Sequence, residues 1–110
     1  SITNDTNKTL TDRLAAHLAD MQQNFAQVES ALQERGLLLT YADIIEMHKW
    51  LLIRKLYLVP FTRRVRRLWM TTFPTLHPRM LANPLISPRD KAKYLLTRLH
   101  LFPFKTRRRT

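Results

Sequence analysis

The chain has 110 residues and a formal net charge of +11, with one glycine, six prolines and no cysteine. Scarce glycine argues against glycine-rich phosphate loops and tight βαβ turns, and the lack of cysteine excludes a disulfide framework, a thiolate nucleophile and a cysteine-based zinc site. This composition favours an all-α chain, either one small domain or two elements that share little core.

The charges divide the sequence into an acidic half and a basic half. Residues 1–46 carry three basic and seven acidic side chains, a net charge of −4. Residues 47–110 carry sixteen basic side chains and one acid, Asp90, a net charge of +15. The second half is therefore expected to meet an anionic partner: a phospholipid surface, a nucleic-acid backbone or an acidic protein face.

Residues 1–39 predict an acidic helix with a heptad pattern. Thr9 and Asp12 have the spacing of a capping box, so we expect the helix to begin there, after a frayed start, and to end at Arg35 before a left-handed Gly36. Apolar residues recur at alternating steps of four and three, which is an a/d seam of nearly three heptads. The members of the seam are Leu14, Leu18, Met21, Phe25, Val28 and Leu32.

The seam has two interpretations, which the sequence leaves open. It packs either on the second helix of the same chain, as an antiparallel hairpin with its turn at residues 36–39, or on other copies, as a short parallel coiled coil in a dimer or trimer. Nearly three heptads are short for independent stability. The flanking e and g positions do little to select a partner; they are Ala15, His17, Gln22, Asn24, Glu29 and Ala31.

The middle segment, residues 40–70, predicts two helices. A second capping box, Thr40 with Asp43, opens the first of them, which stops before Pro60. After Trp50 the apolar surface of this helix becomes nearly continuous, which indicates burial on more than one side. Pro60 also suits the first position of the next helix.

The helix predicted over residues 61–70 has two contrasting faces. One is apolar and includes Phe61, Leu68 and Trp69, and the other is occupied by arginines. With no acid nearby, these arginines repel one another and favour phosphate, whose oxygens the planar guanidinium binds in pairs. A basic face opposite Trp, Phe and Leu is also typical of a helix that lies in a membrane interface.

The last segment, residues 71–110, predicts proline-rich turns, a basic amphipathic helix and a basic tail. Residues 71–86 hold three prolines and are expected to be irregular, with one turn near Met80. Ser87 is an N-cap followed by proline at the first helical position, so a helix should begin there and run to about Leu101. Like the helix predicted over residues 61–70, it has apolar residues on one side, here leucines, and bases elsewhere.

These patterns predict two groups of contact residues. Contact with lipid phosphate or another phosphate is predicted for Arg63, Arg64, Arg66, Arg67, Lys91, Lys93, Arg98, Arg107, Arg108 and Arg109. Insertion into a membrane or a partner is predicted for Trp50, Phe61, Trp69, Leu95 and Phe102. The expected function is non-catalytic membrane association and scaffolding, at the cytoplasmic face of a membrane, by a peripheral segment that binds an anionic surface.

Neither enzymatic activity nor a cofactor or metal is expected from these residues. None of the four histidines has a histidine or carboxylate four residues away, as a helical metal site requires. The best acid–base pair in the sequence, Glu46 with His48, points to different helix faces. No other combination on the chain resembles a catalytic site.

Two other functions fit the same charge. Arginine-rich helices and basic tails bind RNA or DNA, and an apolar stripe also suits a protein–protein docking module. The membrane is preferred because a short chain has limited interior in which to hide large aromatic rings such as those of Trp50, Trp69 and Phe73. Nucleic-acid binding does not require exposed rings of this kind.

The stretch from Trp50 to Leu68 reads WLLIRKLYLVPFTRRVRRL. It resembles a segment near the ends of bacterial surface-polysaccharide enzymes, the O-antigen glycosyltransferases and the chain-terminating kinase/methyltransferases. In those enzymes a coiled coil leads into a Trp-Arg-x-Thr-x-Pro-Leu-Arg-Arg type run. Pro60 and Phe61 match this run, as do the two arginines that follow, but the Trp-Arg-x-Thr core is absent. The resemblance implies a non-catalytic region that holds a lipopolysaccharide-assembly enzyme at the inner membrane or docks it to a partner enzyme.

Overall fold

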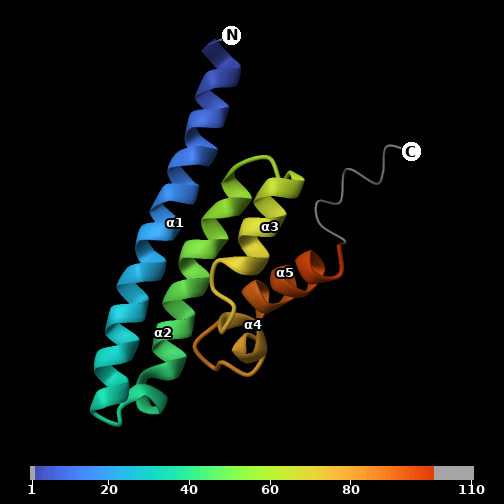
Figure 1. Ribbon diagram of the computed structural model, residues 1–110. Helices are drawn as coiled ribbons and strands as arrows, with labels where there is room; N and C mark the ends of the chain where they lie inside the picture. Colours follow the sequence, from blue (N-terminus) through green and yellow to red (C-terminus); the bar gives the residue numbers. More distant parts are fainter. Residues whose placement is uncertain (1, 101–110) are drawn as a thin grey trace.

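A computed structural model describes residues 2–100 of the chain, and the side chains of residues 10–100. Within this range the protein is all-α, as the sequence predicted, and no strand is present. Five α-helices and one 3₁₀ helix follow one another (Figure 1). They are α1 (Ile2–Glu34), α2 (Leu38–Ile53), η1 (Arg54–Leu58), α3 (Arg63–Thr71), α4 (Leu76–Arg79) and α5 (Pro88–Arg98).

The two longest helices form an antiparallel hairpin, and the shorter helices gather on one side of it. α1 runs along α2, and in this view α3, α4 and α5 lie beyond α2 (Figure 1). α3 and the segment after it also contact α1, through Arg64 with Asp12 and Phe73 with Phe25. The N-terminal part of α1 extends beyond the end of α2. This arrangement places α3 and α5 next to each other, at a distance from the α1–α2 turn.

The turn between α1 and α2 follows directly from the single glycine. Gly36 has a φ of 70°, the left-handed conformation that glycine adopts without steric cost. The N–H of Leu37 donates to the carbonyl of Leu32 at 2.8 Å and that of Gly36 to Gln33 at 3.1 Å, the two bonds of a Schellman motif. Leu37 is then at once the N-cap of α2, so the cap predicted at Thr40 is wrong.

Two other predicted helix starts are also wrong, and one is confirmed. α1 begins at Ile2 and not at Thr9, so the frayed start predicted for the residues before Thr9 is wrong from Ile2 onward. α3 begins after Thr62, whose hydroxyl accepts from the N–H of Val65 at 3.2 Å, and not at Pro60. A hydroxyl that satisfies an orphan amide is a stronger start than a proline alone. The predicted cap at Ser87 is confirmed, because it accepts from Asp90 at 3.1 Å.

One hydrophobic core joins residues from all parts of the described chain. Leu18, Trp50 and Trp69 belong to it, with exposed fractions of 2%, 1% and 0%. Both indoles contact the ring of Tyr94, with centroids 6.2 and 5.3 Å apart. The expectation that Trp50, Trp69 and Phe73 are exposed is therefore wrong, because helices from both halves of the sequence close over them.

The heptad seam of α1 is used mainly within the chain. Leu14, Leu18, Met21 and Phe25 pack on the core beside α2, and Phe25 meets Phe73 edge to face at 5.6 Å. The seam is used less at its end, where Val28 is 48% exposed. Of the two interpretations, the hairpin is the one that this fold adopts. Association between copies stays a prediction.

Candidate phosphate-binding surface

Acids of the first half of the sequence pair with bases of the second half. Four of the five ion pairs among the described residues join residues 1–46 to residues 47–110, and the fifth joins Arg54 to Asp90. The four are Glu29–Lys49, Glu46–Lys49, Asp12–Arg64 and Asp43–Arg79, with N–O distances of 2.6, 3.3, 2.9 and 3.7 Å. The charge division along the sequence is thus partly neutralised by the fold.

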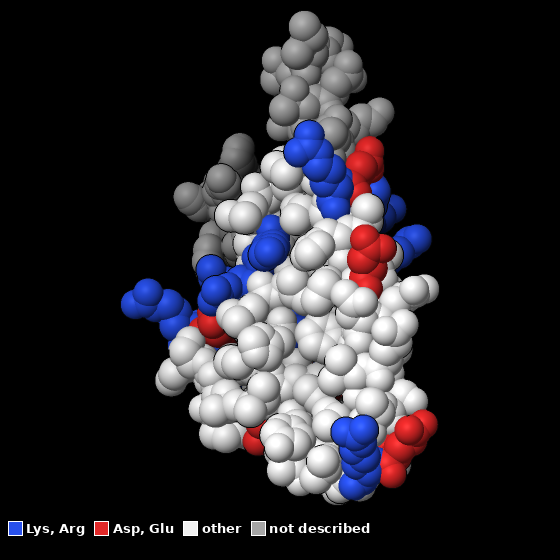
Figure 2. Space-filling view, turned by 90° about the vertical axis from the view of Figure 1, so that its left-hand side faces the viewer, with Lys and Arg blue, Asp and Glu red and all other residues white. Residues whose placement is uncertain are grey.

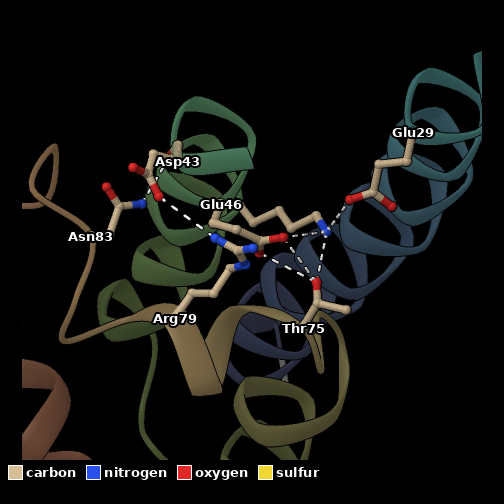
Figure 3. A network of polar contacts seen from close by, with 7 residues as sticks. Glu29, Asp43, Glu46, Thr75, Arg79 and Asn83 are labelled. Atoms are coloured by element: carbon tan, nitrogen blue, oxygen red, sulfur yellow. Dashed lines mark hydrogen bonds and ion pairs between the residues drawn. The ribbon is translucent and has the colours of Figure 1, made fainter. Parts of the chain in front are cut away.

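The most enclosed of these pairs form a network around Lys49 (Figure 3). The Lys49 ammonium, with its side chain 4% exposed, donates to Glu29, to Glu46 and, at 2.9 Å, to the hydroxyl of Thr75. Thr75 in turn donates to Glu46 at 3.1 Å. The network joins α1, α2 and the segment before α4. Because the charges of this network satisfy one another within the fold, none of them is available to a ligand.

Aromatic rings and a neighbouring amide complete the surroundings of this network. The Lys49 ammonium lies 5.6 Å from the ring centroid of Phe25 and 5.8 Å from that of Phe73, distances at which a cation is attracted to a ring face. Gln22 donates to the backbone carbonyl of Thr72 at 2.7 Å. Gln22 and Glu29 occupy e positions of the heptad, so these positions face the rest of the chain, which the sequence analysis missed.

One signal in the sequence could have revealed the network. Lys49 lies three residues after Glu46 in a mostly apolar helix, a spacing at which opposite charges are neighbours. A charged pair in such a setting indicates a buried ion pair with further partners. Glu46 is buried whereas His48 is exposed, so the two do lie on different faces, as predicted.

α3 turns its arginines in three directions. Val65 and Trp69 are buried, and at about 100° per residue Arg63 and Arg67 lie opposite Val65, on the outer side of the helix. Both of these arginines are exposed. Arg64 leans toward α1, where it pairs with Asp12. The outermost strip of α3 is therefore made of guanidinium groups.

Arg66 faces α5 and is engaged in the fold. Its guanidinium donates to the backbone carbonyl of Thr97 at 2.8 Å and lies 5.2 Å from the ring centroid of Phe61. A cation at the C-terminal end of a helix complements the partial negative charge there. Of the four arginines of α3, all of which were predicted to contact phosphate, Arg66 thus has a structural use, while Arg63 and Arg67 point outward.

α5 adds more bases beside α3. Arg98 is exposed and approaches Met70 of α3 at 3.9 Å, and the Lys93 ammonium lies 5.2 Å from the ring of Tyr57. Apart from Arg66, which is bound to Thr97, six bases on α3 and α5 have no acid within 4.0 Å among the described side chains: Arg63, Arg67, Arg89, Lys91, Lys93 and Arg98. We call these six residues the basic surface.

The α1 side of the molecule differs from the basic surface. Seen from that side, basic and acidic side chains lie beside one another in several places, with a wide uncharged area between them (Figure 2). No continuous field of one sign covers the part of this face that the structure describes. Among the described side chains, Arg13, Arg35 and Lys55 also have no acid within 4.0 Å, but the neighbouring helices α3 and α5 together carry six such bases.

The residues predicted to insert are found in different environments. Trp50 and Trp69 are in the core, Phe61 is half-buried in a stack with Tyr57 at 5.6 Å, and Leu95 is 41% exposed. Phe102 and the arginines of the tail, Arg107, Arg108 and Arg109, lie outside the described residues. Leu58 and Leu99, which the sequence analysis did not single out for insertion, are 77% and 63% exposed.

A cluster of rings between α3, α4 and α5 contains a half-buried histidine. The Nε2–H of His77 donates to the carbonyl of Met70 at 3.0 Å, and its Nδ1 accepts from the Tyr94 hydroxyl at 3.1 Å. Burial, and to a lesser degree the charge of Arg98, lowers the pKa of His77 below its ordinary value of 6.5. Burial likewise raises the pKa of Tyr57 to about 12. His77 is therefore neutral and serves the packing.

The described residues include no group of three or more His, Asp or Glu side chains that could hold a metal ion. No helix in the same part of the chain is long and apolar enough to cross a membrane. A scan against models of protein families, a search of curated proteins and a search of solved structures each found no match.

Proposed function

We propose that the chain is a peripheral segment that attaches to an anionic membrane through the basic surface of α3 and α5. The observation that carries the proposal is the contrast in charge pairing. Asp12, Glu29, Asp43 and Glu46 of the first half are paired with bases elsewhere in the fold, whereas six bases on two neighbouring helices have no acid partner among the described side chains. Like charges held together in this way repel one another unless an anion binds.

The number of bases is sufficient for peripheral binding. A basic residue near an anionic leaflet contributes about 1 kcal/mol to binding, so the six together supply enough attraction for attachment without a spanning helix. Exposed leucines beside these bases, Leu95 and Leu99, favour lipid over other polyanions. The attachment is expected to weaken as salt rises, because the bases are exposed or half-buried.

Nucleic acid is the second candidate partner, and the burial of Trp50 and Trp69 favours it. The membrane was preferred because these two rings were expected to be exposed. They lie in the core instead, so that argument no longer applies. An arginine strip without exposed indoles also fits a phosphodiester backbone, with salt-sensitive and sequence-independent affinity.

Sedimentation with vesicles separates the two candidates. The chain is expected to sediment with vesicles of phosphatidylglycerol and phosphatidylcholine, and to stay in solution with phosphatidylcholine alone. A short RNA duplex is offered to the same preparation in a mobility-shift assay across a range of salt. A chain that ignores both kinds of vesicle but shifts the duplex with a steep salt dependence supports nucleic acid instead.

Scaffolding of a polysaccharide-assembly enzyme stays a prediction, as does docking to a partner protein. The scaffolding role follows from the resemblance of the stretch from Trp50 to Leu68. Docking to a partner protein follows from the apolar residues of the chain. A docking module would form a 1:1 complex that is insensitive to lipid and nucleic acid. Substitutions of exposed leucines, and not of the arginines, would then abolish the complex.

A further inference from the structure

α5 is turned so that two leucines at its C-terminal end, Leu95 and Leu99, face solvent. Its buried residues are Tyr94 and Thr97, with exposed fractions of 4% and 0%, whereas Leu95 and Leu99 are 41% and 63% exposed. A surface helix of a soluble domain normally buries its leucines and exposes its polar residues. No leucine of α5 is fully buried: Leu96 is half-buried, and Leu95 and Leu99 lie on the surface. Thr97 is in the core instead, so for these residues the usual relation is reversed.

The exposed leucines form a stripe with bases along both edges. At about 100° per residue, Ala92, Leu95 and Leu99 share the outward side of α5, opposite Tyr94 and Thr97. The same geometry places Lys91 and Arg98 on one flank of the stripe, and Arg89 and Lys93 on the other. We call Ala92, Leu95 and Leu99 the leucine stripe.

Hydrogen bonds to Thr97 fix this rotation of the helix. The Thr97 hydroxyl donates to the carbonyl of Lys93 at 2.9 Å and accepts from the Tyr57 hydroxyl at 2.6 Å. The Thr97 carbonyl accepts from Arg66 at 2.8 Å. Rotating α5 to bury its leucines would break the bonds that join Thr97 to Tyr57 and Arg66 and leave their polar groups unsatisfied, which is costly. The stripe is therefore held at the surface.

The 3₁₀ helix η1, whose last residue is another exposed leucine, lies beside the end of α5. Tyr57 hydrogen-bonds to Thr97, so the backbone of the following Leu58 is near the C-terminal turn of the helix. Leu58 is 77% exposed and is followed by Val59 and Pro60, which connect η1 to α3. The leucine stripe and Leu58 thus border the same basic surface.

We propose that Leu95 and Leu99 insert into the acyl-chain boundary of an anionic bilayer, with Leu58 at the margin, while the flanking bases contact lipid phosphates. This inference rests on the proposed function and names the residues that enter the membrane. The occupant is a bilayer because the apolar stripe has bases on both of its flanks, the charge arrangement of a helix that lies in an anionic interface. Leu95 and Leu99 thus replace Trp50 and Trp69 as the residues expected to insert, because both tryptophans are buried in the core.

Insertion is measured directly with single-cysteine labels, since the chain contains no cysteine of its own. Leu95→Cys, Leu99→Cys and Leu58→Cys are each labelled with the environment-sensitive fluorophore NBD and mixed with vesicles of phosphatidylglycerol and phosphatidylcholine. We expect a blue shift and higher intensity at positions 95 and 99, a smaller change at 58, and quenching by lipids that carry a nitroxide on the acyl chain.

The matched control is Leu39→Cys, at a residue that is 81% exposed near the α1–α2 turn, away from α5 (Figure 1). Its label should keep the spectrum that it has in water when vesicles are added. If the chain sediments with the vesicles but the labels at 95 and 99 behave like the one at 39, insertion is wrong and attachment is electrostatic alone. If the chain does not sediment, the proposed function fails, and insertion fails with it.

A second pair of variants measures the contribution of the stripe. Leu95→Ser with Leu99→Ser should weaken binding to anionic vesicles about tenfold or more, because two leucines lose their transfer into an apolar medium. Leu39→Ser with Leu81→Ser removes two leucines that are also exposed, 81% and 50%, and should leave binding within about twofold. Circular dichroism confirms that both proteins are folded. Equal binding by the two variants overturns the inference.

Discussion

Two regions of the molecule differ in whether their positive charges are paired with acids. Around Lys49, a buried ammonium is surrounded by two carboxylates, a hydroxyl and two aromatic rings. On the outer strip of α3, Arg63 and Arg67 point into solvent, and among the described residues no acid lies within 4.0 Å of them. The first arrangement satisfies its own charges, whereas the second leaves them available. Net charge therefore indicates a partner only after the pairs within the fold have been taken out.

The largest expected effect comes from a substitution in the paired region around Lys49. Lys49→Met removes the central cation and leaves Glu46 buried without a counter-charge, which should cost about 3–5 kcal/mol of unfolding free energy. Arg64→Gln removes one partner of an exposed pair and should cost less than about 1 kcal/mol. Urea unfolding at neutral pH measures both. Similar losses for the two variants would show that burial does not distinguish these pairs.

A second comparison lies within α3. Arg66→Gln takes the donor from the Thr97 carbonyl and the cation from Phe61, so it should cost about 1–3 kcal/mol. Arg67→Gln, one residue away on the outer strip, should change stability by less than about 0.5 kcal/mol. Thermal or urea unfolding measures the stability of the two variants and so tests whether Arg66 has a structural role that Arg67 lacks. Equal stability would contradict the structural use of Arg66.

The two left-handed positions should respond in opposite directions. Gly36→Ala meets no atom within 4 Å but forces a methyl into a φ of 70°, which should cost about 1–2 kcal/mol. His100 adopts a similar φ of 62°, so His100→Gly relieves strain and should gain up to about 1 kcal/mol. Unfolding midpoints in urea give both values. A stabilising Gly36→Ala would contradict the turn described above.

Acid should weaken the fold through His77. Its pKa is lowered in the folded chain, chiefly by burial, so the unfolded chain takes up the proton first as pH falls. The stability that the neutral ring provides is complete above pH 6.5 and is lost as pH falls from 6.5 through the lower folded pKa. Urea unfolding at pH 7.5 and pH 5.5 measures this loss. His77→Gln should have a flatter dependence on pH, and an equally steep one would exclude His77 as the cause.

Local signals in the sequence predicted much of the fold. The all-α class, the left-handed Gly36 and the Ser87 cap were correct, because each depends on a few neighbouring residues. The starts at Thr9 and Thr40 were wrong because a capping box is also tolerated inside a helix, where neighbouring turns already supply the hydrogen bonds. Periodicity identified the seam, but it did not distinguish the hairpin from a coiled coil.

The candidate site was less predictable, since it depends on which faces meet in three dimensions. Arginines on one helix look alike in the sequence, yet Arg66 binds α5 while Arg63 points outward. Trp50 and Trp69 resembled surface residues in a short chain, but helices that are distant in sequence bury them. The reversed rotation of α5 depends on Thr97, whose partners come from η1 and α3. Spacing alone does not reveal such contacts.

The most direct test compares two double variants with the same net charge. Arg63→Gln with Arg67→Gln removes two bases of the basic surface, whereas Arg35→Gln with Arg79→Gln removes two bases elsewhere, one of them paired with Asp43. The first should weaken binding to phosphatidylglycerol-containing vesicles by about 2 kcal/mol, roughly 30-fold, and the second by less than about threefold. Equal weakening would mean that net charge alone governs attachment, which contradicts a membrane-binding surface on α3 and α5.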